Sequence, residues 1–585
     1  MSTLIREAEF VYALPLPELQ EIGCKTVQLN GHTIALWYIA GEIYAVDNRC
    51  PHMGFPLDKG SVKDGILTCH WHHARFDLES GGTFDQFADD VRAFATEVRD
   101  GEVWVDLARY TDPKAHQRER LQVGLERDIS LVSGKAVLTL LDDGGDPVEP
   151  FRIGLQFGTT FRRAGWGQGL TMLTCFMNML PYLDEVDRPR ALYQGLAAVS
   201  ADTIGSAPRF RVRPLPNQET DILTLKRWFR RFIEVRDSEG AERCIVSAVR
   251  AGATSPEMAD MLFASVTDHR YIQIGHPADF TNKAFEALDI VGWEHAELVL
   301  TSLVSGYANA PRMEESNAWR NPIDLIEILH EAFAQLAQME VKTGDSDWNG
   351  RNQLVPTLLS DDPQAIADAL LAALRAEATM DQLAATVSYA AALRIARFHT
   401  SNEFGDWDTA LHTFTFANAI EQGLKRSPSV ELLRGVFDAA MSVYLDRFLN
   451  IPEAKIPVMK DANGNGRITP AADILSDFPQ LLDKQQQVNQ SAELVVNYLG
   501  QDGDPDGLLA MLGKLLLRED RDFHTIQSVE AAFKQYETLR GTAAGTHVLV
   551  AAARYLAAHS PTVRAQGQTY QIAARLHRGE HLFAE

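Results

Sequence analysis

Hydrophobic and polar positions follow two different periods along this chain, and the change falls near residue 110. Before it, short apolar runs alternate with polar positions and are separated by turn pairs, a pattern typical of antiparallel strands. Asn30-Gly31 and Asp100-Gly101 each suit the two-residue turn of a hairpin, and Gly41-Glu42 leads into a further run. The predicted strands are residues 26–29, 33–39, 43–46, 95–99 and 103–107. This part of the chain is therefore predicted to be a small antiparallel β domain.

From about Leu121 onward, apolar residues recur three and four positions apart in Ala-rich windows, as they do on one face of an α-helix. Asp361-Asp362-Pro363 suits a helix start, and Gly423 and Gly500 fall near predicted ends. The second region is therefore predicted to be nearly all α, as an irregular bundle or stacked helical hairpins. The predicted helices are residues 169–183, 256–266, 282–290, 296–303, 322–337, 363–377, 381–398, 408–424, 430–449, 492–499, 507–517, 525–539 and 547–559.

Between the two patterns lies a polar stretch without periodicity. We therefore expect a β domain over residues 1–110, a linker over 111–120, and a large all-α helical domain over 121–585 that is a candidate for catalysis. The fold class is thus multidomain, with a small antiparallel β part followed by a large helical part.

Composition narrows the functional classes. The chain has 585 residues, 45% of them hydrophobic, and a formal net charge of −24, so it is large enough for several globular domains. Its acidity argues against nucleic acid or an anionic membrane as a partner. No secretory signal opens the chain, and apolar stretches such as residues 169–180 are too short to cross a bilayer. We expect a soluble, cytoplasmic protein.

Two Cys/His pairs in the β region carry the most specific chemical signal. Cys50 and His52 form a Cys-x-His pair, and Cys69 and His72 form a Cys-x-x-His pair after a short loop rich in Gly and Pro. In a Rieske [2Fe-2S] cluster two thiolates hold one iron and two neutral imidazoles hold the other. A zinc site of the Cys2His2 kind keeps its Cys pair and its His pair separate along the chain, whereas this chain interleaves them. The spacing therefore favours a [2Fe-2S] cluster over zinc.

Residues 10–108 resemble a Rieske ferredoxin domain along their whole length, and the resemblance implies Cys50, His52, Cys69 and His72 as the cluster ligands. Two departures are visible: His70 stands where the family usually has Pro, and His73 where it usually has Gly. The extra loop cysteines that form a disulfide in high-potential relatives are missing as well. The resemblance therefore implies a low-potential carrier of the kind that serves oxygenase systems, and five cysteines in all suit a reducing compartment.

The helical region does not contain the usual oxygenase iron motif. No Asp/Glu-x2-His-x4-His run follows residue 110, and His269 to His276 has the wrong spacing. Glu327-x-x-His330 is a single copy of a motif that a di-iron bundle needs twice. Asp461 to Ile468 resembles the first half of a calcium loop, but Ala472 occupies the position of the bidentate Glu, which makes a calcium site improbable.

The most suggestive cluster in the helical region is the stretch from residue 398 to 414. His399 ends one predicted helix, and Asp408 and His412 lie at i and i+4 near the start of the next, so the three side chains are candidates for a catalytic or second metal site. The alternative is that Asp408 caps a helix and His412 is a buried, hydrogen-bonded core residue. His276 and His524 are weaker companions.

Short pieces of the helical region, around His276-Pro277 and residues 399–412, are similar to the questin-oxidase-like family of helical oxidases. Together with the Rieske pattern, this favours an oxidoreductase that takes electrons from an external NAD(P)H-dependent reductase or ferredoxin reductase and oxidises a small organic substrate. No nucleotide-binding Gly-x-Gly-x-x-Gly follows a strand, so the reductase is expected to be a separate protein. The alternative is a non-catalytic electron-transfer or redox-sensing protein whose helical domain binds a partner.

Overall fold

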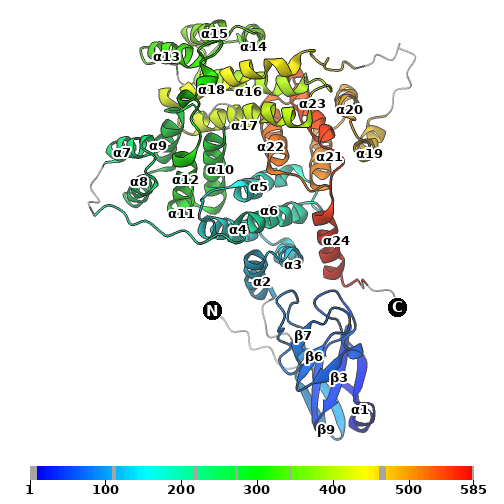
Figure 1. Ribbon diagram of the computed structural model, residues 1–585. Coiled ribbons are helices and arrows are strands. Elements are labelled where there is room, and N and C mark those ends of the chain that lie inside the picture. Colours follow the sequence, from blue (N-terminus) through cyan, green and yellow to red (C-terminus); the bar gives the residue numbers. More distant parts are fainter. Residues whose placement is uncertain are drawn as a thin grey trace. The chain divides into compact units, whose positions relative to one another are not determined.

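The computed structural model describes residues 9–108, 113–216, 221–270, 275–342, 344, 346–459, 470–580 and 582. The chain forms two compact units, of which one joins residues 1–153 to residues 566–585 and the other spans residues 154–565. Within the described residues, all strands lie in the N-terminal part, and the elements after it are helices (Figure 1). The prediction of a small antiparallel β domain followed by a large helical region is confirmed. The calcium-loop resemblance at Asp461 to Ile468 lies outside the described residues.

The strands form three antiparallel sheets with the orders β1-β10-β9, β2-β3-β4-β8 and β5-β6-β7. Asn30 and Gly31 have φ of +47° and +86°, and Asp100 and Gly101 have +51° and +79°, so both predicted turns are two-residue turns of the mirror-image type. The bounds are β1 Phe10–Pro15, α1 Leu16–Ile22, β2 Cys24–Leu29, β3 His32–Ile39, β4 Glu42–Asp47, β5 Ser61–Lys63, β6 Ile66–Thr68, β7 Arg75–Asp77, β8 Ala93–Phe94, β9 Thr96–Arg99 and β10 Glu102–Asp106.

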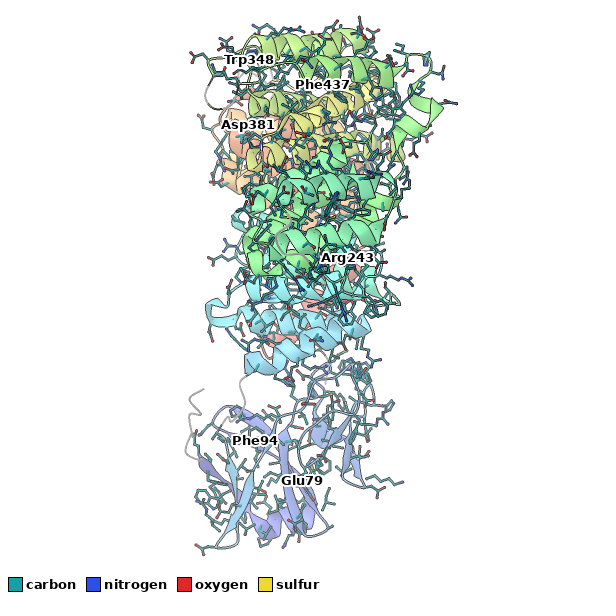
Figure 2. All side chains as sticks on the ribbon, turned by 90° about the vertical axis from the view of Figure 1, so that its left-hand side faces the viewer. Glu79, Phe94, Arg243, Trp348, Asp381 and Phe437 are labelled. Carbon is teal, nitrogen blue, oxygen red and sulfur yellow. The ribbon has the colours of Figure 1, made fainter. Side chains whose placement is uncertain are left out.

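Two apolar clusters fill the β part. Ile34, Leu36 and Val105 are buried with Phe94 in one of them, and Figure 2 shows Phe94 among the strands. The other cluster lies under the Cys/His loops and includes both cysteines of those loops; its further members include Leu57, Leu67, Phe76 and Leu78. The alternation along the strands thus buries one face of each sheet, and a separate core supports the loops that hold the candidate ligands.

Three helices share the compact unit of the β sheets: α2 Pro113–Arg127, α3 Ser130–Leu141 and α24 Ala565–His577. The segment expected as a linker, residues 111–120, enters α2 at Pro113 and is helical from there on. Its residues are polar because most of this first stretch of α2 is only partly covered, so it lacks the apolar stripe that reveals a helix in a sequence. The compact unit therefore extends beyond the residues that the strand pattern marks.

The larger unit is built from helices and short 3-10 turns. Their bounds are α4 Val148–Phe161, α5 Gln168–Met179, α6 Arg188–Thr203, α7 Ile222–Glu234, α8 Ser238–Arg250, α9 Ser255–Thr267, α10 His276–Val291, α11 Ala296–Thr301, α12 Val304–Asn309, α13 Leu325–Leu336, α14 Arg351–Leu358, α15 Pro363–Arg375, α16 Met380–Ala396, α17 Phe404–Arg426, α18 Val430–Leu445, α19 Ala471–Leu482, α20 Val488–Gly500, α21 Pro505–Leu517, α22 Phe523–Leu539 and α23 Ala543–Ala558. Every predicted helix is present.

The long helix α17 packs on α10, α16, α18 and α22, so it connects parts of the chain that are distant in sequence. Phe437 of α18 is fully buried in this helical unit (Figure 2). Gly423, expected near a helix end, lies inside α17, where a Cβ atom would come within about 3.0 Å of Phe263 and 3.1 Å of Leu432. Its role is thus close packing between helices rather than a helix stop.

Several helices escaped the sequence analysis for identifiable reasons. Helix α6 is buried on almost every side and therefore has no polar stripe. Helix α7, in contrast, has one apolar and one polar face, because the buried residues Leu225, Phe229 and Ile233 recur every four residues. This signal was present in the sequence. No helix in the described part of the chain combines the length and the apolar character that crossing a bilayer requires.

Candidate redox centres

The first Cys/His pair lies in the loop after β4. The backbone N–H of Cys50 donates to the carbonyl of Phe55 at 2.8 Å, and the N–H of Gly54 donates to the carbonyl of Cys50 at 2.8 Å. Gly54 has φ of +86°, a conformation that side chains with a Cβ rarely adopt. Glycine therefore closes the tight turn that contains Cys50 and His52.

The second pair lies between β6 and β7 in a loop of the same design. The N–H of Cys69 donates to the carbonyl of Ala74 at 2.9 Å, and the N–H of His73 donates to the carbonyl of Cys69 at 3.0 Å. His73 has φ of +60°, so it adopts a left-handed conformation at the position where the Rieske ferredoxin pattern usually has Gly. His70 instead bonds through Nε2 to the hydroxyl of Ser61 at 2.9 Å. Neither departure from the pattern changes the closure of the loop.

The two loops bring the four candidate ligands together. The thiols of Cys50 and Cys69 hydrogen-bond to each other, and the ring centroids of His52 and His72 lie 4.9 Å apart. Nδ1 of His52 is buried without a hydrogen-bond partner, as expected for a ring nitrogen whose partner is a metal. Both cysteines are buried, whereas His52 is half-buried and His72 is exposed. Two sheltered thiols and two imidazoles nearer to the solvent are the donor set of a Rieske cluster.

Electrostatics around the loops favours the metal-binding forms of Cys69 and His52 and disfavours the thiolate of Cys50. The hydrogen bond from Cys50 is the main cause that lowers the pKa of the Cys69 thiol to about 6, and the same bond together with burial raises the pKa of Cys50. Burial, followed by the charges of His72 and Lys135, lowers the pKa of His52 to about 4. His52 is therefore a neutral imidazole at neutral pH, which is the form that binds a metal.

Residues 9–94 match the model of the family described as the Rieske [2Fe-2S] domain, and this range contains both loops. The N-terminal part of the chain is a Rieske [2Fe-2S] domain. Such a domain carries a [2Fe-2S] cluster, which transfers single electrons. The donor set of the two loops fits this cofactor.

Known proteins that resemble the Rieske domain include electron carriers of dioxygenase systems. The ferredoxin component of the naphthalene 1,2-dioxygenase/salicylate 5-hydroxylase systems of Ralstonia sp is 29% identical over 93 residues, which cover 16% of this chain and 86% of that protein. The solved ferredoxin of carbazole 1,9a-dioxygenase from Nocardioides aromaticivorans IC177 is 24% identical with a TM-score of 0.16, and the match covers 16% of this chain and 95% of that one.

A longer relative is Apoptosis-inducing factor 3 of Homo sapiens, which is 27% identical over 176 residues. The match covers 30% of this chain and 27% of that protein, so the chain spans about a quarter of the length of this relative. All of these likenesses concern a small part of the chain and leave most of the helical unit without a counterpart.

Within the helical unit, three histidines converge from three different helices. His276 begins α10, His412 lies in α17, and His524 is the second residue of α22. One ring nitrogen from each lies within 4.8 Å of the others. The ring centroids of His412 and His524 are 4.7 Å apart, and that of His276 lies 5.0 Å from that of His412. The structure thus brings His412 together with His276 and His524, the two residues that the sequence marks as weaker candidates.

Each of these histidines also has an acceptor for its second ring nitrogen. Nδ1 of His276 lies 3.2 Å from Oδ2 of Asp279, and Nδ1 of His412 lies 2.6 Å from the backbone carbonyl of Asp408. Nδ1 of His524 lies 3.7 Å from Oδ2 of Asp522. Partners at Nδ1 orient the rings, an arrangement that commonly supports metal-bound histidines. Burial, aided by the two neighbouring imidazoles, lowers the pKa of His412 to about 4, so this ring is neutral.

The sequence analysis missed the importance of His276 and His524 because they are far from His412 in the chain. A signal was present, since each of the three histidines has an aspartate within four residues. His399 is placed differently: its Nδ1 bonds to the hydroxyl of Ser401 at 2.7 Å. Among the described residues, His399 belongs to none of the groups of converging metal-ligating side chains, and a role for it stays a prediction.

Asp408 lies next to the three histidines and not among them. Its Oδ1 accepts a hydrogen bond from the hydroxyl of Tyr555 at 2.7 Å, and its carboxylate lies within 4.8 Å of Asp522 and His524. Nε2 of His559 is 3.8 Å from the same oxygen. Asp408 is therefore a neighbouring carboxylate with a tyrosine partner, in a position to accept or donate a proton.

A pocket of about 260 Å³ opens beside His276. Its walls are mainly apolar and aromatic, and they include Trp166, Phe280, Leu303 and Tyr307. A larger cavity of about 520 Å³ in the same unit is lined by charged residues such as Arg209 and contains none of the three histidines. The apolar pocket is thus the one that adjoins the convergent site.

Proposed function

We propose that the Rieske domain receives electrons from an external reductase and passes them to the helical unit, which oxidises a small organic substrate at a metal ion held by His276, His412 and His524. The observation that carries this proposal is the convergence of three imidazole donors, from three helices, in a chain that also has a one-electron carrier. In this proposal Cys50 and Cys69 hold one iron of the cluster and His52 and His72 the other.

Iron is the ion that this combination supports best. Imidazole nitrogens suit zinc, copper, iron and nickel, but zinc has no redox chemistry and would make no use of electrons from a Rieske domain. Iron sites with histidine ligands and open positions activate dioxygen in other proteins. The relatives whose names mention dioxygenase systems agree with dioxygen as the oxidant.

The chain's own residues divide the remaining tasks. Asp279, the carbonyl of Asp408 and Asp522 hold the three rings in place through Nδ1. The Asp408 carboxylate, which accepts a hydrogen bond from Tyr555, supplies or removes a proton beside the site. In this proposal Asp408 therefore keeps the catalytic role that the sequence predicts for it.

The pocket at His276 supports a mainly apolar substrate. A volume of about 260 Å³ suits a small organic molecule, and most of its wall offers no charge. Polar side chains in the wall, such as Asn309, are few and would orient the substrate without supplying most of its affinity. The partners of the protein are thus an NAD(P)H-dependent reductase or a ferredoxin reductase and a small organic substrate, and five cysteines without a disulfide among them agree with a cytoplasmic location.

Iron analysis of the purified full-length chain tests the proposal. Two irons in the cluster and one at the histidines make three per chain, and His412→Ala should lower the count to two while the Rieske spectrum stays. The matched control is His330→Ala, which removes an exposed histidine of α13 and should leave three irons.

Oxygen consumption separates the two functions that the sequence left open. Reduced protein with a suitable apolar substrate should consume dioxygen, and His412→Ala should abolish this consumption. Two irons per chain together with no substrate-dependent oxygen uptake would defeat the catalytic proposal and leave a non-catalytic electron carrier whose helical unit binds a partner.

A further inference from the structure

The first cluster loop is contacted by a helix that is not part of the β sheets. Lys135 of α3 donates from Nζ to the carbonyl of Pro51 and, at 2.7 Å, to the carbonyl of His52. These two carbonyls belong to the turn that carries the candidate ligands Cys50 and His52. The appended helix α3 thus places an ammonium group directly against the backbone of the cluster-binding loop.

Asp89 is a carboxylate close to Lys135, but other side chains already bind it. The charge of Lys135 is therefore available to the cluster loop. Oδ1 of Asp89 is 2.7 Å from Nε2 of His116, and its Oδ2 accepts from Gln117 at 2.8 Å. Arg120 approaches Asp89 as well, at 3.4 Å. Three side chains of α2 therefore compensate Asp89.

Two further cations, Arg49 and Arg120, lie close enough to repel the Lys135 ammonium, and the thiol of Cys50 lies close enough to attract it. Lys135 also lines a cavity of about 270 Å³ that includes Cys50 and Arg49. The side chain is thus part of a cationic environment at the thiol end of the loop.

We propose that Lys135 is a positioning residue for the Rieske cluster. Its ammonium group holds the loop of Cys50 and His52 through two carbonyls, and its positive charge beside the cluster raises the reduction potential. A reduced cluster carries one more negative charge than an oxidised one, so a nearby cation stabilises the reduced form.

The test is a redox titration of the full-length, cluster-loaded protein, followed by electron spin resonance of the reduced cluster. Lys135→Met removes the charge and both hydrogen bonds, Lys135→Gln keeps a donor without the charge, and Lys135→Arg keeps the charge. We expect the equilibrium constant for reduction to fall about tenfold in the Met and Gln variants, which is about 59 mV for one electron, and to stay close to the parent value in the Arg variant.

The matched control is Lys63→Met, which removes an exposed lysine of β5 in the same domain and should leave the potential unchanged. If the Met variant does not retain its cluster, the comparison of Gln with Arg still decides the matter. Equal potentials in the Gln and Arg variants, or a drop in Lys63→Met as large as in Lys135→Gln, would overturn the proposal.

Discussion

His70, His72 and His73 stand within four residues of one another in the second cluster loop, yet the structure uses each of them differently. His70 bonds to Ser61, and His73 adopts a left-handed backbone conformation that closes the loop. Only His72 has its ring beside that of His52. At this scale a residue type is a weak guide, and the spacing from Cys69 is what selects the candidate ligand.

Replacing a cluster ligand should remove the cofactor. We expect His72→Ala or Cys69→Ala to abolish the visible spectrum of the Rieske cluster and to destabilise the N-terminal domain, because binding of the metal contributes to folding. Visible absorbance and electron spin resonance measure the first effect, and thermal unfolding measures the second. His70→Ala is the control, and it should keep the spectrum. A normal spin resonance signal in His72→Ala would refute the ligand assignment.

Asp446 is a buried acid outside both redox sites. Its side chain is fully buried after α18, and burial raises its pKa to about 7, although Thr413 and Arg394 act in the opposite direction. The unfolded chain loses this proton near pH 4, whereas the folded chain keeps it until about pH 7. Stability is therefore lost as the pH rises through this window.

Asp446→Asn should remove this pH dependence. The amide keeps the shape without an ionisable proton, so we expect the variant to unfold with a free energy higher by roughly 3 kcal/mol at pH 8, and by less at pH 5. Urea denaturation of the parent and the variant at both pH values measures the difference. A constant difference between the two proteins across this range would show that Asp446 does not titrate as described.

Among the elements, α5 and α6 approach each other through glycines. A Cβ atom on Gly195 would lie 2.8 Å from the Cα atom of Leu173, and one on Gly169 would lie 2.6 Å from the carbonyl oxygen of Ala198. Both obstacles are backbone atoms, which cannot rotate away. These two glycines therefore set the distance between two helices that are buried in the helical unit.

We expect Gly195→Ala to lower the free energy of unfolding by about 1–3 kcal/mol, because the added methyl group overpacks the contact. Gly405→Ala is the matched control in α17: its Cβ atom would meet nothing within 4 Å, so the better helix propensity of alanine should raise stability by up to about 1 kcal/mol. Denaturant unfolding followed by the helical circular dichroism signal compares the two. Equal effects would mean that α5 and α6 adjust their separation freely.

At the scale of the whole molecule, the two ends of the chain belong to one compact unit. Helix α24 belongs to the compact unit of the Rieske domain although it lies more than 400 residues further along the chain. Arg49, the neighbour of Cys50, donates from Nη2 to the carbonyls of Leu576 at 2.9 Å and of Glu580 at 2.7 Å. Carbonyls at a helix end lack partners within the helix, so this guanidinium acts as a cap supplied by the cluster loop.

Arg49→Ala should loosen α24. Two charge-assisted hydrogen bonds are lost, so we expect the amides of residues 565–577 to exchange hydrogen faster and the cluster absorbance to be lost at a lower temperature, with a cost of about 1.5–3 kcal/mol. Arg99→Ala is the control, since that side chain forms an exposed pair with Glu97 and such pairs contribute little. Unchanged exchange in α24 would show that Arg49 does not hold it.

The sequence by itself determined the elements and the cofactor of the N-terminal domain. Turn pairs such as Asn30-Gly31 and Asp100-Gly101 are local signals, and the interleaved Cys and His residues lie within one small domain, so short windows contain nearly all the relevant information. Many of the helical windows with one polar face were readable as well, although α7, which has such a face, was missed. Helices buried on all sides, such as α6, have no such stripe, and the polar start of α2, which the sequence places in a linker, also lacks one.

Only the tertiary structure brought together the three histidines of the candidate second site. His276, His412 and His524 start on three separate helices, and their meeting depends on how α10, α17 and α22 pack. Helix packing is set by the fit of side chains from distant segments, which no local pattern encodes. The same holds for Lys135 and Arg49, whose partners lie on other elements of the same unit. Local spacing thus determined the cluster, whereas long-range packing decided which histidines face one another and which charges lie beside the cluster.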